Sequence, residues 1–236
     1  MKVKSFGVVV LLLLCGCLAR SAPITGVTQT WTYNAETRKG TVHFVNVSRK
    51  NIVSYNIGEY VTYKDGHVFV AGERTEMNMY GEGVFAPGQT HDEEVSGPTM
   101  MEGADLTDPN NFRAEVDVVV YEDDTAEVNN QRAFEHMLEI RQAAVEATMT
   151  LNQVVQKVLE DPSITDQHTA IVAELQRLAV VAKKEQHHTL GSYLDARVNE
   201  IPWNKTELPA FIKQNEQEIA KLEPHANLTV VQGMQP

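Results

Sequence analysis

The spacing of apolar residues changes once along this chain, near residue 129, and the change limits the folds that the chain can adopt. Before this point apolar and polar residues tend to alternate, as in a β-strand. After it, apolar residues recur every three or four positions, as on one face of a helix. We therefore predict an α+β fold, with a strand domain over residues 23–128 and a helical region over residues 129–223. Residues 224–236 continue neither pattern and are predicted to form a flexible tail.

Turn residues divide the first region into short strands. Asp65-Gly66 and Pro87-Gly88 favour tight turns, because glycine tolerates a positive φ and proline fixes its own φ. The segments between turns are too short for the crossover helices that a parallel sheet requires. A series of about seven short strands is typical of an antiparallel β-sandwich. In the clearest strand, residues 114–121, alternation predicts that one face carries Val116, Val118 and Val120.

Two apolar stripes predict two long helices after residue 129. The first stripe contains Met137, Ile140, Ala144, Ala147, Leu151, Val154 and Val158. The second contains Ile164, His168, Ile171, Leu175, Leu178 and Ala182. Pro162 ends the first helix and Ser163 is the expected N-cap of the second, so the short connection predicts an antiparallel helical hairpin. Shorter C-terminal helices are expected over residues 193–201 and 206–222, after a break at Gly191.

The first 22 residues have the pattern of a secretory signal peptide. Lys2 and Lys4 give a basic start, and a mostly apolar run follows from Phe6 to Leu14. Even extended to Ala19, the apolar stretch covers about 14 residues, whereas a helix needs roughly 20 to cross a bilayer. We therefore expect an exported protein, whether periplasmic, anchored to the cell envelope or secreted.

Two schemes for cleavage of this signal peptide stay open. Residues 14–17 (Leu-Cys-Gly-Cys) resemble the bacterial lipobox, and this resemblance implies that Cys17 is the lipidated first residue of the mature chain. Ordinary signal-peptidase cleavage between Ala19 and Ala22 is the alternative. Both cysteines of the sequence lie in this region, so the mature chain is expected to have no disulfide, no thiolate nucleophile and no cysteine-ligated zinc.

The charge of the chain restricts its partners. Lys and Arg number 20 and Asp and Glu 32, which gives a net charge of −12. Such a surface is the wrong sign for general binding of phosphates, so no nucleic-acid partner is expected. It also disfavours adsorption to anionic lipid, so contact with a membrane is expected only through a lipid anchor on Cys17.

Few residues form a pattern that carries chemistry. His91-Asp92-Glu93-Glu94 offers four possible metal ligands, but neighbours in a strand alternate faces, and we interpret the run as a solvated acidic loop. We interpret His187-His188 as the end of the second long helix, His168 as a structural histidine and Asp123-Asp124 as part of a turn. Glu135, His136 and Glu139 lack the spacing of a zinc protease, and no phosphate-binding loop or nucleophile elbow is present. The sequence thus predicts no catalytic residue, no metal ligand and no cofactor.

Residues 41–121 resemble a known class of domain. An Asn46-Val47-Ser48 turn, a strand over residues 52–57, Asp65-Gly66 and Pro87-Gly88 follow one another. The order is similar to that in small immunoglobulin-like sandwich domains of bacterial exported proteins. The resemblance implies a sandwich fold and a role as an adhesion or accessory module, without catalytic residues. The helical hairpin behind these residues departs from that pattern.

Three classes of function stay open. The first is a non-enzymatic binding module whose partner is another extracytoplasmic protein or a second copy of the chain. The second is a carbohydrate-binding module, because aromatic side chains on one exposed face could stack on sugar rings; the candidates are Trp31, Tyr33, Tyr60, Tyr63, Phe69 and Tyr80. The third is a hydrolase with an unrecognised site. An exposed apolar patch would favour a protein partner, and a deep pocket with converging carboxylates would favour an enzyme. Ala144 and Ala147 suggest a partner on the first long helix, since small side chains let another helix approach.

Overall fold

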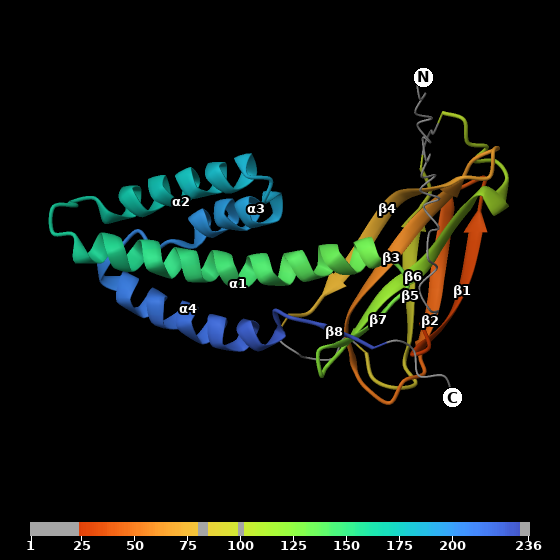
Figure 1. The fold of residues 1–236 in the computed structure, drawn as a ribbon, viewed down its shortest axis with the longest axis horizontal. Helices are drawn as coiled ribbons and strands as arrows, with labels where there is room; N and C mark the ends of the chain where they lie inside the picture. Colours follow the sequence, from red (N-terminus) through yellow and green to blue (C-terminus); the bar gives the residue numbers. More distant parts are fainter. Residues whose placement is uncertain (1–23, 80–84, 99–101, 232–236) are drawn as a thin grey trace, which may run out of the picture.

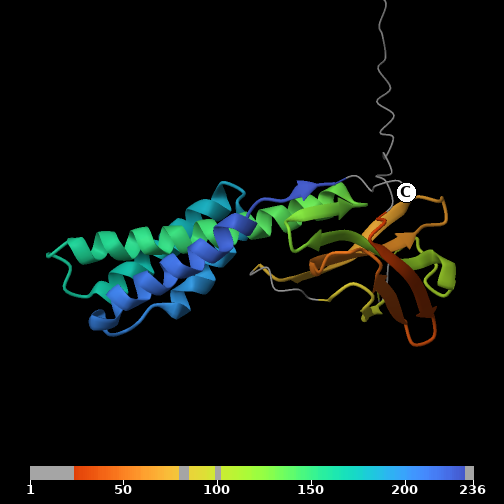
Figure 2. The same cartoon turned by 90° about the horizontal axis from the view of Figure 1, so that it is seen from below.

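The computed structural model describes residues 24–79, 85–98 and 102–231. It confirms the α+β class: two β-sheets lie N-terminal to four α-helices in the described part of the chain. Figure 1 shows the helices extending away from the sheets as a bundle, and the same arrangement is seen from below in Figure 2. None of the described helices is long and apolar enough to span a membrane. The predicted signal peptide and Cys17 lie outside the described residues.

The smaller sheet has three antiparallel strands in the order β1-β2-β5. These strands are β1 (Val27–Asn34), β2 (Lys39–Asn46) and β5 (Thr90–Ser96). At the end of β2 the side chain of Asn46 accepts hydrogen bonds from the amide and hydroxyl of Ser48, so the Asn-x-Ser motif forms the turn that the sequence indicates.

The larger sheet has five strands in the order β4-β3-β6-β7-β8. Its strands are β3 (Ile52–Thr62), β4 (Val68–Met77), β6 (Phe112–Tyr121), β7 (Thr125–Val128) and β8 (Thr229–Val230). All neighbours are antiparallel except β7 and β8, which pair in parallel. β4 therefore forms one edge of this sheet.

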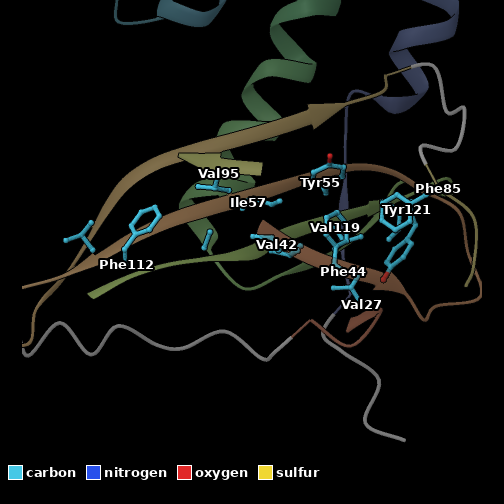
Figure 3. Close-up of a cluster of buried hydrophobic side chains, with 14 residues drawn as sticks. Val27, Val42, Phe44, Tyr55, Ile57, Phe85, Val95, Phe112, Val119 and Tyr121 are labelled. Carbon is cyan, nitrogen blue, oxygen red and sulfur yellow. The ribbon is translucent and has the colours of Figure 1, made fainter. Parts of the chain in front are cut away.

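The two sheets enclose an apolar core, part of which Figure 3 shows. Phe44 is fully buried there, and its ring meets those of Tyr55 and Phe85 at centroid distances of 5.1 and 5.3 Å. Val119 and Tyr121 of β6 face the same core. Burial of these rings supplies the main driving force for packing one sheet on the other.

The prediction that Val116, Val118 and Val120 share one face is wrong. The pairing of β3 with β6 shifts register between Val116 and Val118, which leaves Asp117 as an extra residue in β6. Val116 consequently faces the core between the sheets, whereas Val118 and Val120 face the helices. Both faces of β6 are buried.

Helix α1 (Gln131–Glu160) joins the sheets to the bundle. Its first two turns pack Phe134 and Met137 on the helix-facing side of the larger sheet. The rest of its apolar stripe lies among the other helices, where Ala147 and Leu151 are fully buried. Figure 1 shows α2 and α3 on one side of α1 and α4 on the other. The stripe of α1 is therefore covered by this chain's own helices.

The three remaining helices correct several boundaries. α2 (Gln167–Lys184) is capped by Asp166, whose side chain accepts from the amide of Thr169, instead of by Ser163. α3 (His188–Arg197) begins just after His187, so the histidine pair starts a helix and does not end one. Gly191 lies inside α3 and does not break it. A Cβ at this position would come within 2.9 Å of the Ala179 carbonyl oxygen in α2, which accounts for a glycine here. α4 (Leu208–Leu222) agrees with expectation.

The C-terminal segment also differs from the predicted flexible tail. Residues 224–231 form a short 3-10 turn and then β8. The amide of Thr229 donates to Asp124 O at 2.9 Å, and that of Val231 donates to Ala126 O at 2.8 Å. The main chain of this segment thus forms an edge strand of the larger sheet. Its pairing depends on backbone hydrogen bonds, which the local pattern of apolar residues does not reveal.

Candidate functional site

The residues that the sequence offers as metal ligands do not form a metal site. His91-Asp92-Glu93-Glu94 lies in β5 and not in a loop, so its side chains alternate between faces. Asp92 pairs with His43, while His91 and Glu93 both contact the Tyr55 hydroxyl, at 2.9 and 3.2 Å. Within residues 24–79, 85–98 and 102–231, no three His, Cys, Asp or Glu side chains lie close enough together to hold an ion.

The other candidate residues have structural partners. His168 Nδ1 lies 3.2 Å from Pro202 O, and its ring stacks on Trp203 at a centroid distance of 3.8 Å. Asp124 occupies a turn with φ of 58° and pairs with His225 and the buried Arg141. These contacts of His168 and Asp124 hold segments of the chain together.

The aromatic residues do not form one exposed platform. Trp31 and Tyr33 pack together at a centroid distance of 5.9 Å against the core between the sheets. Tyr60 is buried, Tyr63 stacks on His67, and Phe69, half exposed, stands apart at the edge of β4. Tyr80 lies outside the described residues.

A groove of about 930 Å³ lies between the edge strand β4 and the first turns of α1. Its lining combines a continuous run of strand residues with one flank of the helix: Val68, Phe69, Val70, Ala71, Gly72, Glu73, Arg132, Glu135, His136 and Glu139. We refer to these ten residues as the β4–α1 groove. The groove cannot be recognised from the sequence, because neither the residues of β4 nor those of α1 show by themselves that the helix leaves the edge of β4 uncovered.

The edge of β4 in this groove is apolar and unprotected. Val68 and Phe69 are 47% and 49% exposed, and no charged side chain occurs from Val68 to Gly72. Edge strands usually carry charges that discourage pairing with another chain. The edge strand β5 has this protection, with four successive ionisable residues. The edge strand β1 also lacks charged side chains, so the feature that distinguishes the edge of β4 is the large groove beside it.

Two hydrogen bonds define which main-chain groups of β4 face outward. The amide of Tyr63 donates to His67 O at 2.9 Å, and that of Asn78 donates to Val53 O at 3.2 Å. In an antiparallel ladder, residue pairs that exchange hydrogen bonds alternate with pairs whose main-chain groups point away from the partner strand. Counting from either bond gives the same assignment along β4, once the register shift at Glu59 and Tyr60 is included. We infer that the amides of Val70 and Glu73 point away from β3. No other described strand pairs with this edge.

The side chains of these outward-facing residues form the floor of the groove. Val70 lies opposite Tyr60, and Glu73 lies opposite Gly58, so both share the face of the sheet on which α1 begins. A Cβ at Gly58 would come within 2.1 Å of Asp117 Oδ2, which shows how closely the groups beneath α1 are packed.

A buried polar cluster positions the helical wall of the groove. The side-chain oxygen of Asn130 accepts from the amides of Arg132 and Ala133 and so caps α1. The side-chain nitrogen of Asn130 donates to Tyr60 Oη at 3.0 Å and to Asp117 Oδ2 at 3.1 Å. Burial raises the pKa of Asp117 to about 6, although hydrogen bonds from Tyr60 and Asn130 favour the charged form.

A second groove, of about 740 Å³, lies where α1, α3 and α4 meet the end of β4. Its main charged group, Arg197, donates to Glu218 Oε1 at 2.6 Å and to Glu200 Oε2 at 2.7 Å. The charges of Arg197, Glu200 and Glu218 in this groove therefore satisfy one another. The β4–α1 groove is an open surface lined by three carboxylates, those of Glu73, Glu135 and Glu139; Glu135 accepts from Gln131, and Glu139 lies 4.0 Å from His136.

Comparison with known proteins identifies no relative of established function. No protein-family model and no curated protein sequence matches the chain. One solved structure, a hypothetical protein from Peptoclostridium difficile 630, is 12% identical and covers 49% of this chain and 91% of its own, with a TM-score of 0.28. A similarity at this level does not establish a shared fold, so the function must be argued from the geometry of the chain itself.

Proposed function

We propose that this chain is an exported, non-enzymatic module that binds a segment of another extracytoplasmic protein in the β4–α1 groove. The observation that carries the proposal is the open edge of β4, uncharged from Val68 to Gly72, beside a concave surface of about 930 Å³. Exposed apolar surface of this kind marks interaction sites in soluble proteins.

The arrangement of the helices supports this choice of surface. The sequence points to the stripe of α1 as a possible partner site, yet Ala144 and Ala147 are buried by other parts of the same chain. Met149, Val180 and Trp203 are exposed in the helical region, but none of them lines either of the two grooves. On the sheet, in contrast, Val68 and Phe69 are adjacent and border a groove.

The other two classes of function have less support. A carbohydrate platform would need several exposed aromatic rings on one face, and most of the candidates pack against the core. A hydrolase would need two carboxylates held at a fixed separation in a deep cleft, whereas the carboxylates of Glu73, Glu135 and Glu139 line an open groove.

Export and a lipid on Cys17 complete the proposal, and both rest on the pattern of residues 1–22. The intact mass of the mature protein from its native membrane or medium would give the cleavage site and detect the lipid together. A mature chain that begins between Ala19 and Ala22 would exclude the lipid anchor. An uncleaved N-terminus would contradict export through this signal.

Binding at the groove can be tested by site-specific photocrosslinking in the cells that make the protein. A photoreactive phenylalanine analogue at Phe69 is expected to form a covalent adduct with a defined extracytoplasmic protein, identified by mass spectrometry. The matched control is the same analogue at Val180 of α2, which is 51% exposed and belongs to a helix that contributes no residue to the groove. No adduct at Phe69, or the same adducts at both positions, would refute the proposed function.

A further inference from the structure

We propose that the occupant of the β4–α1 groove is an extended, basic segment of the partner, which adds as a further strand to the outer edge of β4. This inference rests on the proposed function and specifies the chemistry of the partner. The larger sheet would then have the order of added strand, β4, β3, β6, β7 and β8.

The main chain of β4 is the first reason to expect an added strand. The outward amides of Val70 and Glu73 belong to a row of polar groups that no described strand uses. A helix placed in the groove would leave this row without main-chain partners, whereas an extended segment pairs with it directly. The six lining residues Val68 to Glu73 match an added strand of about six residues.

The side chains beside the edge define two different surfaces for the added strand. Val68, Val70 and Glu73 lie on the face that α1 borders, and Phe69 lies on the opposite face, because its partner Val61 belongs to the core between the sheets. Successive residues of an added strand would alternate between these faces. Its pattern is therefore polar residues toward α1 and apolar residues toward Phe69.

The charges in the groove determine the sign of the polar residues. Glu73 contributes one carboxylate from the floor, and Glu135 and Glu139 contribute two from the helical wall, against the single guanidinium of Arg132. A basic segment complements this surface. A second copy of the chain would bring a net charge of −12 and its own Glu73 and Glu76 to the contact, so the electrostatics disfavour self-association at this edge.

A synthetic peptide can test both parts of the inference on the mature chain. The probe is an acetylated and amidated octapeptide that alternates lysine and valine, and its control has glutamate in place of every lysine. Isothermal titration or fluorescence anisotropy at low salt should show at least tenfold tighter binding of the lysine peptide. Equal binding of the two peptides would overturn the assignment of a basic partner.

Amide hydrogen exchange measured by NMR tests the strand geometry. A saturating amount of the lysine peptide should slow exchange at Val70 and Glu73 by at least tenfold, because their amides would then donate to the added strand. Phe69 and Arg74, whose amides already face β3 in the inferred phase, are internal controls and should change little. Binding without protection of Val70 and Glu73 would overturn strand addition and leave the groove as a binding site.

Charge reversal on α1 tests the location of the contact. Glu135→Lys combined with Glu139→Lys should weaken binding of the lysine peptide at least tenfold, whereas Glu146→Lys, an exposed position on the same helix outside the groove, should not. Equal effects of the two changes would overturn the location.

The remaining outcomes separate this inference from the proposed function. If the lysine peptide does not bind but Phe69 still crosslinks to a partner in cells, the groove functions and its occupant is not a basic strand. If light scattering gives the mass of two chains and the peptide reduces it to one, the edge belongs to a second copy, and the inference is wrong.

Discussion

Asn130 and Asp117 fix the start of α1 to the sheet through two contacts. Asn130 Nδ2 donates to Asp117 Oδ2 at 3.1 Å, and the Asn130 amide donates to Asp117 O at 3.3 Å. Because Asn130 also caps α1, one side chain both begins the helix and attaches it to β6. The wall of the β4–α1 groove thus depends on a carboxyl group that is buried at a bulge.

The substitution Asp117→Asn should alter the pH dependence of stability. A carboxyl group whose pKa is raised on folding stabilises the protein fully below its unfolded pKa, near 4, and loses this contribution as the pH rises through about 6. The free energy of unfolding of the wild type, minus that of the variant, should therefore fall between pH 4 and pH 7, by up to about 3 kcal/mol. Urea unfolding of both proteins across this range measures the difference, and a constant value would contradict the prediction.

Arg141→Met should destabilise the junction between sheet and bundle. Arg141 is 1% exposed and donates to Asp124 Oδ1, His225 O and Ser54 Oγ. Removal of one member of a buried ion pair costs about 3–5 kcal/mol, because the remaining charge loses its partner. Arg177→Met, which removes an exposed pair with Glu174, should cost little. Similar denaturation midpoints for the two variants would show that Arg141 does not hold the junction.

Ala147→Glu should destabilise the protein by a few kcal/mol, because this position is fully buried among the helices and a charge there has no partner. Met149→Glu is the control, since Met149 lies on the same helix and is 41% exposed. Thermal unfolding separates the two variants. A stable Ala147→Glu protein of lower light-scattering mass would instead identify the position as a contact between copies.

Val118→Asp should release the first turns of α1 from the sheet. Val118 is fully buried beside Phe134 and Met137, so an unpaired carboxylate there costs several kcal/mol. Glu115→Ala, in the same strand, removes a partly exposed side chain and should cost little. Near-ultraviolet circular dichroism and urea unfolding report both changes, and equal losses of stability would show that Val118 does not face α1.

The class and order of the elements could be predicted from the sequence, because the spacing of apolar residues shows which face of a strand or helix is buried. The prediction was wrong where both faces of an element are buried. In β6 both faces are covered, and the extra residue Asp117 reverses the alternation after Val116. Ser163 and Asp166 are both good capping residues, and only the packed helix selects Asp166.

The groove could not be predicted from local pattern, because it depends on what α1 leaves uncovered. The sequence places Phe69 among aromatic residues of the sandwich and Glu135, His136 and Glu139 on a helix. Their proximity follows from the position at which Asn130 attaches α1 over β3 and β6. An uncharged edge such as that of β4 is a sequence signal that can be recognised once the strand order is known.

The parallel pairing of β8 with β7 makes the helical bundle an insertion within the larger sheet. The strand β8, which closes this sheet, follows all of the described helices along the chain. A chain that emerges from a ribosome or an export channel with its N-terminus first therefore cannot complete the sheet until every helix has emerged. A nascent chain halted before residue 229 would expose β7 as an open edge.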